Sequence, residues 1–199
     1  MSHLTDQPFY LYEGDYLINR KLSKYYDAPV WYYNTLGGII LNKQDDGTYR
    51  ANWLATVLYG KNKPVVHQPS DIQFKGQVYT LTNYASFSAA GYLASMLQQH
   101  TNSIFVGEEP GGNANECVAG EAFDLILPKT KNRVLMQIVH SNIKVDRENN
   151  GHGVEPHYPI RPSVAQIQHD IDPEMDLVKR LVSGEKTGPS TKEIVSKDK

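Results

Sequence analysis

The chain has 199 residues and a mass of 22.4 kDa, which is enough for one domain or slightly more. Its 20 Lys and Arg nearly balance its 22 Asp and Glu, and this net charge of −2 argues against a nucleic-acid partner, which needs a clustered basic excess. The single cysteine, Cys117, excludes an internal disulfide. No stretch approaches the ~20 apolar residues of a membrane-spanning helix. The first residues lack the basic segment followed by an apolar segment that a signal peptide has. We therefore expect neither a membrane span nor a signal peptide in this sequence.

The first zone of the sequence, residues 1–63, is rich in aromatic side chains. It contains nine of the 13 tyrosines and both tryptophans, Trp31 and Trp53. Aromatic and β-branched residues that are interrupted by Gly, Pro and Asp-Gly predict short strands and hairpins. We place Gly37-Gly38 in one hairpin and the clearest turn at Asp46-Gly47. The zone is thus expected to be an aromatic-rich β-hairpin region of the same domain as the residues that follow.

The second zone, residues 64–183, alternates between strand and helix patterns. In chain order the predicted elements are strand 77–83, turn 84–88, helix 89–100, strands 103–107, 123–127 and 134–139, and helix 173–182. Three- and four-residue spacing gives the first helix one buried face, which comprises Ala89, Tyr92, Leu93, Met96 and Leu97. The zone is predicted to be an α/β core. Residues 184–199 are rich in Gly, Ser, Thr and Lys and predict a flexible tail.

Ser88 stands directly before the first predicted helix of this core. A serine hydroxyl becomes a nucleophile when a base removes its proton and when donors stabilise the oxyanion that forms. The free amides of a helix's first turn are such donors, and the Ala89 N–H is the first of them. Serine is also a preferred helix cap. On this local pattern alone, capping by Ser88 or Ser86 is the favoured interpretation.

Three blocks of the sequence together resemble one protein family. They are residues 76–94 (GQVYTLTNYASFSAAGYLA), 104–113 (IFVGEEPGGN) and 151–156 (GHGVEP). In this order and spacing they are similar to the C-terminal half of the catalytic domain of tail-specific (C-terminal processing) serine peptidases. They are closer to the tricorn-core-like and Bacteroidetes-type branch than to the Ser/Lys branch. The resemblance covers about residues 64–183 and implies a ClpP/crotonase-like α/β superhelix.

The resemblance implies roles for individual residues. Ser88 matches the family nucleophile, and the Ala89 N–H matches one oxyanion donor. Asn113 stands where the Ser/Lys branch has its lysine base, and because an amide cannot take up a proton, that dyad is excluded for this chain. Glu148 falls near the position of the downstream acid of the related branch. It fits equally well as an exposed loop glutamate without a catalytic role.

Two parts of the family machinery are not found in this sequence. The related branch takes its base from a histidine in an Asp-Gly-His-like motif upstream of the serine. His3 and His67 are the only histidines before Ser88, and neither has that context. The Asp-x-Arg-x-Asn-x-Gly-Gly stretch that supplies the second oxyanion amide in the family is also missing. The resemblance therefore implies the distal part of a longer family member.

The sequence predicts neither a metal nor a cofactor. His140, His152 and His157 are close in sequence, but spacings of 12 and 5 residues match no helical pair of metal ligands. Gly111-Gly112 lacks the Gly-Lys-Ser/Thr that completes a phosphate-binding loop.

The leading hypothesis is a serine endopeptidase-like domain that acts on peptide or unfolded-protein substrates through Ser88. We expect the isolated chain to be inactive because its base is missing. The alternative is a non-catalytic peptide-binding or assembly module that keeps the peptidase fold. The resemblance implies a location in the periplasm or cell envelope. It leaves open a homo-oligomer or assembly with the missing N-terminal part of the same protein.

Overall fold

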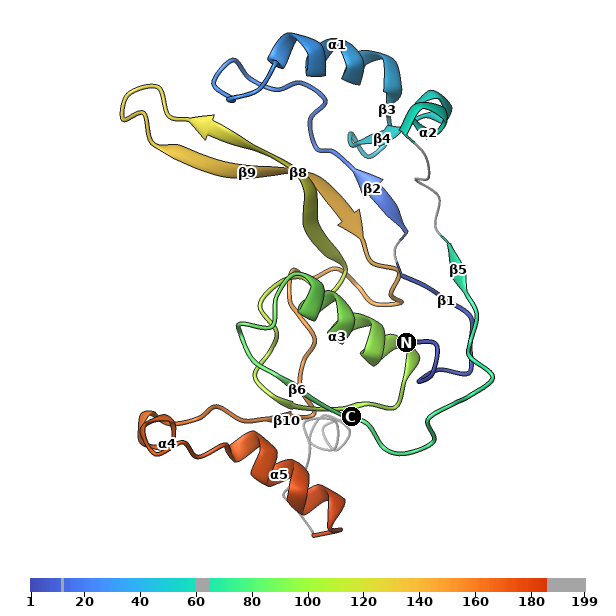
Figure 1. The fold of residues 1–199 in the computed structure, drawn as a ribbon, viewed down its shortest axis with the longest axis vertical. Helices are drawn as coiled ribbons and strands as arrows, with labels where there is room; N and C mark the ends of the chain where they lie inside the picture. The colour runs from blue at the N-terminus through green and yellow to red at the C-terminus, as the bar shows by residue number, and fades with distance from the viewer. Residues whose placement is uncertain (12, 60–64, 186–199) are drawn as a thin grey trace. The chain divides into compact units, whose positions relative to one another are not determined.

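The computed structural model of the chain describes residues 1–11, 13–59 and 65–185 (Figure 1). The chain divides into two units, of which the first contains residues 1–9, 67–115 and 145–199, and the second residues 10–66 and 116–144. Strands β1 (Phe9–Tyr10) and β5 (Val66–His67) form a two-stranded sheet where the chain passes from one unit to the other. The boundary near residue 63 stays a prediction. So does the flexible tail, because residues 186–199 lie outside the described part of the chain.

The first unit contains a parallel sheet of three strands in the order β10 (Tyr158–Pro159), β7 (Ile104–Gly107) and β6 (Tyr79–Thr82). Helix α3 (Ala89–His100) connects β6 to β7, and its bounds are those that the sequence predicts. Because the strands are parallel, the carboxyl ends of β6 and β7 meet at the same edge of the sheet. The turn that carries Ser88 and the loop at 108–113 both start from that edge.

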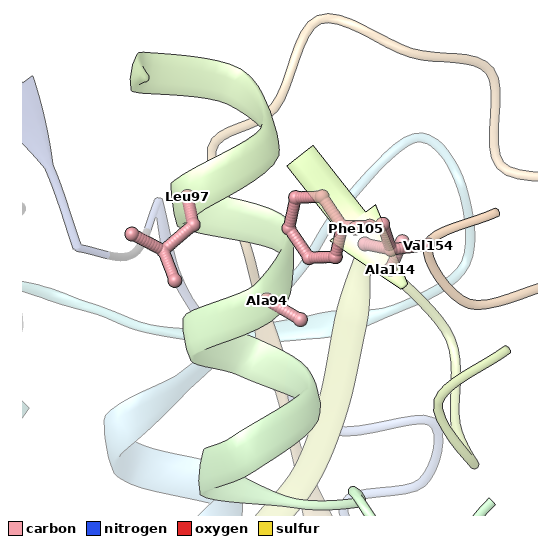
Figure 2. Packing of buried hydrophobic residues seen from close by; sticks show 5 residues of the cluster. All are labelled: Ala94, Leu97, Phe105, Ala114 and Val154. Atoms are coloured by element: carbon pink, nitrogen blue, oxygen red, sulfur yellow. The ribbon is translucent and has the colours of Figure 1, made fainter. Parts of the chain in front are cut away.

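The core of the first unit packs α3 against β7 and two loops. Figure 2 shows Ala94 and Leu97 of α3 with Phe105 of β7, and with Ala114 and Val154 from loops. Phe105 is completely buried.

The predicted buried face of α3 is partly wrong. Met96 and Leu97 are buried, but Leu93 is 48% exposed and Ala89 is exposed as well. Ala94 and Ser95 are buried in its place, and the Ser95 hydroxyl donates to the Gly91 carbonyl at 3.2 Å. Small residues with a satisfied hydroxyl can line a close helix–sheet contact, which counting apolar residues does not reveal.

Two helices, α4 (Val164–Gln168) and α5 (Pro173–Val182), complete the first unit. The bounds predicted for α5 are confirmed. Its start is fixed by Asp172, whose carboxylate accepts from the Met175 N–H at 2.8 Å, and by proline in the first turn. Leu177 is its buried residue.

The second unit contains a long antiparallel pair, β8 (Glu116–Ile126) and β9 (Arg133–Asn142), with β2 (Gly14–Tyr16) on the other side of β9. The predicted strands 123–127 and 134–139 are thus parts of longer strands. An irregularity between Ala119 and Ala122 shifts the pairing of β8 with β9.

The rest of the second unit corrects the prediction of strands and hairpins. The hairpin at Asp46-Gly47 is present, between β3 (Leu41–Lys43) and β4 (Tyr49–Ala51), with Gly47 at φ +84°. It is flanked by two helices, α1 (Val30–Ile40) and α2 (Trp53–Tyr59). The expected hairpin at Gly37-Gly38 is wrong, because both glycines lie inside α1.

Tertiary contacts explain why these aromatic segments are helical. The Asn34 side chain accepts from the Leu22 N–H at 2.7 Å and donates to the Leu22 carbonyl at 3.1 Å. Gly37 lies so close to the backbone of Arg20 that a Cβ would stand 3.0 Å from its carbonyl oxygen. The Asn52 side chain caps α2 by accepting from the Leu54 and Ala55 N–H groups. These contacts outweigh the β propensity of the side chains.

Among the described residues, no helix has the length and apolar character needed to cross a bilayer.

Candidate active site

Ser88 stands at the N-cap of α3 but does not cap it. Its backbone has φ 55° and ψ −123°, its side chain makes no capping hydrogen bond, and the residue is exposed. The turn is built by its neighbours instead. Asn83 accepts from the Ala85 N–H at 3.0 Å, and the Ser86 hydroxyl oxygen accepts from the Asn83 N–H at 3.1 Å. The hydroxyl of Ser88 is therefore available for other chemistry.

The backbone of Ser88 is strained. A residue with a side chain at positive φ outside a favourable turn costs about 1–3 kcal/mol, and it persists where the surroundings hold it in place. Here the Tyr92 N–H donates to the Ser88 carbonyl at 2.9 Å, and the Ala90 N–H donates to the Phe87 carbonyl at 3.2 Å. A strained serine between a strand and a helix is the arrangement that presents a nucleophile in other hydrolase folds.

The Ala89 amide is the first N–H of α3. Among the described residues it has no hydrogen-bond acceptor, as expected for the first turn of a helix. The macrodipole adds partial positive charge at this end of α3. An anion that forms next to Ser88 would meet this free donor.

The loop after β7 lies tightly against the Ser88 turn. The Glu108 N–H donates to the Thr82 carbonyl at 2.8 Å, and the Thr82 hydroxyl donates to the Glu108 carbonyl at 2.8 Å. A Cβ on Gly111 would stand 2.3 Å from the Tyr84 carbonyl oxygen, and Gly91 of α3 approaches the Gly111 carbonyl. At Gly111 the loop packs backbone on backbone against the Ser88 turn, which is possible only because this position has no Cβ.

Glu148 projects from a loop whose residues on both sides are fixed. The Arg147 carbonyl accepts from the Asn115 side chain at 2.9 Å, and Asn149 accepts from the Asn113 side chain at 2.8 Å. The Glu148 carboxylate itself is exposed and has no hydrogen bond within the described residues. A carboxylate on an anchored loop is suited to meet a partner from elsewhere. Within the described residues, no hydrogen bond joins Glu148 to Ser88.

Glu109 links the two loops and is not among the site residues predicted from the sequence. Its carboxylate accepts from the Gly153 N–H at 2.7 Å and lies 3.2 Å from Nδ1 of His152. A Cβ on Gly153 would stand 2.5 Å from the Pro110 carbonyl oxygen. The position of Glu109 inside the VGEEPGG block, which carries part of the family resemblance, is the signal that could have identified it.

A hollow of about 330 Å³ lies beside the Ser88 turn. Ser86 and Asn83 of the turn line one part of it. Its apolar walls are formed by Leu81 of β6 and by Ile167 and Ile171 from the region of α4.

The histidines upstream of Ser88 lie at the opposite end of α3. The His67 ring stacks on Phe9 with 5.3 Å between centroids, and Phe9 is 5.9 Å from the ring of His100, the last residue of α3. The 12 residues of α3 span about 18 Å, so His67 is roughly a helix length away from Ser88. His3 is bonded to the Ile72 carbonyl at 2.8 Å. Burial lowers the pKa of His100, partly offset by Asp146, so its ring is neutral at pH 7.

The remaining histidines are separated. Nδ1 of His157 accepts from the Phe105 N–H at 2.9 Å, His152 contacts Glu109, and His140 stacks on Tyr16 in the second unit. In the part of the chain that the structure describes, no three His, Cys, Asp or Glu side chains converge as metal ligands would.

Comparisons with known proteins give a family for this sequence. A family model described as peptidase family S41 matches residues 20–160. No curated protein matches the chain.

Three solved structures are similar to the fold. Mature CPAF is 18% identical with a TM-score of 0.48, covering 96% of this chain and 42% of that one. A serine-to-alanine mutant of CPAF is 16% identical with a TM-score of 0.47, and the match covers 94% of this chain and 40% of that one. A Parabacteroides merdae protein to which a peptidase function has been attributed is 20% identical with a TM-score of 0.41. That match covers 60% of this chain and 36% of that one. The match thus spans less than half of each of these longer chains.

Proposed function

Because the chain belongs to peptidase family S41, we propose that it supplies the nucleophile of a serine peptidase that cleaves peptides and unfolded proteins. The observation that carries this proposal is the geometry of Ser88. Its backbone is held at φ 55° at the start of α3, and its hydroxyl makes no capping bond. A serine that only capped the helix would have neither property.

The proposed reaction is acyl transfer through Ser88. Its Oγ attacks the carbonyl carbon of the peptide bond while a base takes up the hydroxyl proton. The Ala89 N–H stabilises the oxyanion. The base returns the proton to the leaving amine, and water then hydrolyses the acyl-enzyme. We assign the base and the second oxyanion donor to protein segments outside the described residues, and Glu148 to the acid that orients that base.

The edge of β6 is the proposed track for the substrate. On the side of β6 that faces β7, the Val78 carbonyl accepts from the Ile104 N–H and the Thr82 carbonyl accepts from the Glu108 N–H. In a parallel ladder the intervening residues, Tyr79 and Leu81, direct their N–H and C=O groups to the free edge. An extended peptide can pair there without any catalytic group. We assign the 330 Å³ hollow beside Ser86 to an apolar substrate side chain.

Several finer assignments are proposals on the strength of the family alone. They are a ClpP/crotonase-like superhelix for the complete domain, tail-specific cleavage, and a location in the periplasm or cell envelope. Assembly as a homo-oligomer, or with an N-terminal part of the same protein, belongs with them.

The test is peptidase activity of the natural gene product that contains these 199 residues. Ser88→Ala is expected to lower turnover of unfolded casein by about 10⁴-fold or more, and Glu148→Gln by about 10²- to 10⁴-fold. Glu121→Gln, at another exposed glutamate, is the matched control and should retain full activity. Undiminished turnover in Ser88→Ala would overturn the proposal.

The alternative function is a non-catalytic peptide-binding module. The observation that favours it is the position of His67 and His3, both of which lie away from Ser88. In that case the natural gene product and its Ser88→Ala variant would bind an extended peptide equally well, and neither would cleave it.

A further inference from the structure

Helices α1 and α2 of the second unit expose an unusually apolar surface, which we call the aromatic surface. Its large exposed residues are Trp31, Tyr32, Ile39, Trp53, Val57 and Leu58. Both tryptophans are 75% exposed. Neither helix contains a charged residue, and Gly37 is the only buried residue of α1. A large exposed apolar patch marks an interaction site.

The two helices form one connected structure. Asn52, which caps α2, donates from its side chain to the Ile39 carbonyl at 2.8 Å and from its backbone to the Ile40 carbonyl at 2.9 Å. Figure 1 shows that α1 leads into β3 and that β4 leads into α2. Trp31 and Ile39 lie eight residues apart on one face of α1, and Trp53 and Val57 lie four apart on α2.

Basic residues border the aromatic surface. The segment with Lys21 and Lys24 runs along α1, held by the two Asn34–Leu22 hydrogen bonds, and Lys43 follows α1 on β3; all three lysines are exposed. Of the nearby acids, Asp27 pairs with Arg133 at 2.8 Å, whereas Asp45 and Asp46 in the β3–β4 turn are exposed, and Asp46 accepts from the Thr48 N–H.

The net charges of the two units also favour an anionic partner for the aromatic surface. The second unit has eleven basic and eight acidic residues, a net +3. The first unit, with the candidate active site, has nine and fourteen, a net −5. The apolar surface and the positive charge are therefore on the same unit.

We propose that the aromatic surface docks peripherally on an anionic lipid bilayer. Tryptophan and tyrosine favour the headgroup level of a bilayer, where an apolar ring and a polar edge are both satisfied. Exposed lysines around the patch are attracted to anionic headgroups. A second copy of the chain is a poorer partner, because a symmetric contact would bring the same basic border against itself. This inference does not depend on the role of Ser88.

The experiment uses the two tryptophans as reporters, since Trp31 and Trp53 are the only ones in the chain. Vesicles of phosphatidylcholine with phosphatidylglycerol should shift the tryptophan fluorescence to the blue and sediment the protein. Pure phosphatidylcholine or high salt should weaken binding by about tenfold or more, since each lysine near the surface contributes roughly a several-fold factor.

Variants locate the surface. Trp31→Ala and Trp53→Ala should each lower the affinity for the anionic vesicles by about tenfold. Ile72→Ala, at an isoleucine of the first unit that is 78% exposed, is the control and should bind like the wild type. Lys21→Glu with Lys24→Glu leaves both helices unchanged in sequence, and it should weaken binding by about tenfold or more.

Either of two results would overturn the inference. In the first, circular dichroism shows that the protein is folded, but anionic vesicles do not shift its tryptophan fluorescence. The other is a blue shift that appears on raising the protein concentration without vesicles, which would assign the surface to a second copy.

Discussion

Ser88 combines a strained backbone with a hydroxyl that the fold does not use. Glycine adopts positive φ without a Cβ penalty, so Ser88→Gly should relieve the strain. We expect the free energy of unfolding to rise by about 1 kcal/mol, which for a chain of this size raises the Tm by roughly 2–4 °C. Thermal unfolding followed by circular dichroism measures the change.

Ser88→Ala is the control for this experiment. It removes the hydroxyl but keeps the Cβ and hence the strain, so its Tm should match that of the wild type. A Ser88→Gly variant that is less stable than Ser88→Ala would show that the Ser88 backbone is not strained. The turn would then no longer resemble the strained turn that presents a nucleophile in other hydrolase folds.

Tyr16 offers a second measurement on one residue. Burial, the hydrogen bond to Glu116 at 2.5 Å and the charge of that carboxylate raise the pKa of Tyr16 to about 12. The folded-state pKa is above its ordinary value of 10, so the stabilisation is complete below pH 10 and is lost as the pH rises towards 12. The tyrosinate absorbance of the wild type minus that of Tyr16→Phe should show one group that titrates near pH 12. A difference curve centred near pH 10 would contradict this environment.

At the scale of elements, three loops meet without room for side chains. Gly111→Ala would place a Cβ 2.3 Å from the Tyr84 carbonyl oxygen and push the loop away from the Ser88 turn. We expect a loss of about 1–3 kcal/mol in the free energy of unfolding, measured by urea denaturation. Gly38→Ala is the matched control. It lies in α1 with nothing within 4 Å of its Cβ position, and it should stabilise by about 0.5–1 kcal/mol. Equal effects of the two substitutions would contradict the tight loop contact.

The elements differ in how well the sequence predicts them. For α3 and α5 the predicted bounds match the structure, because a helical spacing of apolar residues marks both segments in the sequence. For α1 the prediction failed, because its helix depends on Asn34 and Gly37 contacting a segment that precedes it in the chain. Such contacts are invisible to a local pattern.

At the scale of the whole molecule, the sequence identified Ser88, Ala89 and Glu148 as candidates but not what holds them. The local pattern of a strand, a turn and a helix start favoured a helix cap at Ser88, and its candidacy as the nucleophile followed from the family resemblance of three separate blocks of sequence. The fixed position of the Glu148 loop depends on Asn113, Asn115 and Glu109, which lie more than 30 residues away from it in the chain. These partners could be recognised only once the topology was known.

The isolated 199-residue chain should not act as a peptidase. Loss of the base costs a serine peptidase several orders of magnitude, because the hydroxyl stays protonated near neutral pH. We expect hydrolysis of casein by residues 1–199 to be no faster than by the Ser88→Ala version, measured side by side. Clear turnover that disappears in Ser88→Ala would show that a base lies within these residues.

The central claim, that Ser88 is the nucleophile, is tested most directly by active-site labelling. The natural gene product that contains this chain is treated with a fluorophosphonate, and the modified peptide is identified by mass spectrometry. Ser86→Ala is the matched control, because Ser86 lies in the same turn and its hydroxyl oxygen accepts from Asn83. We predict one adduct, on Ser88, that is lost in Ser88→Ala and kept in Ser86→Ala. An adduct that survives in Ser88→Ala would contradict the account.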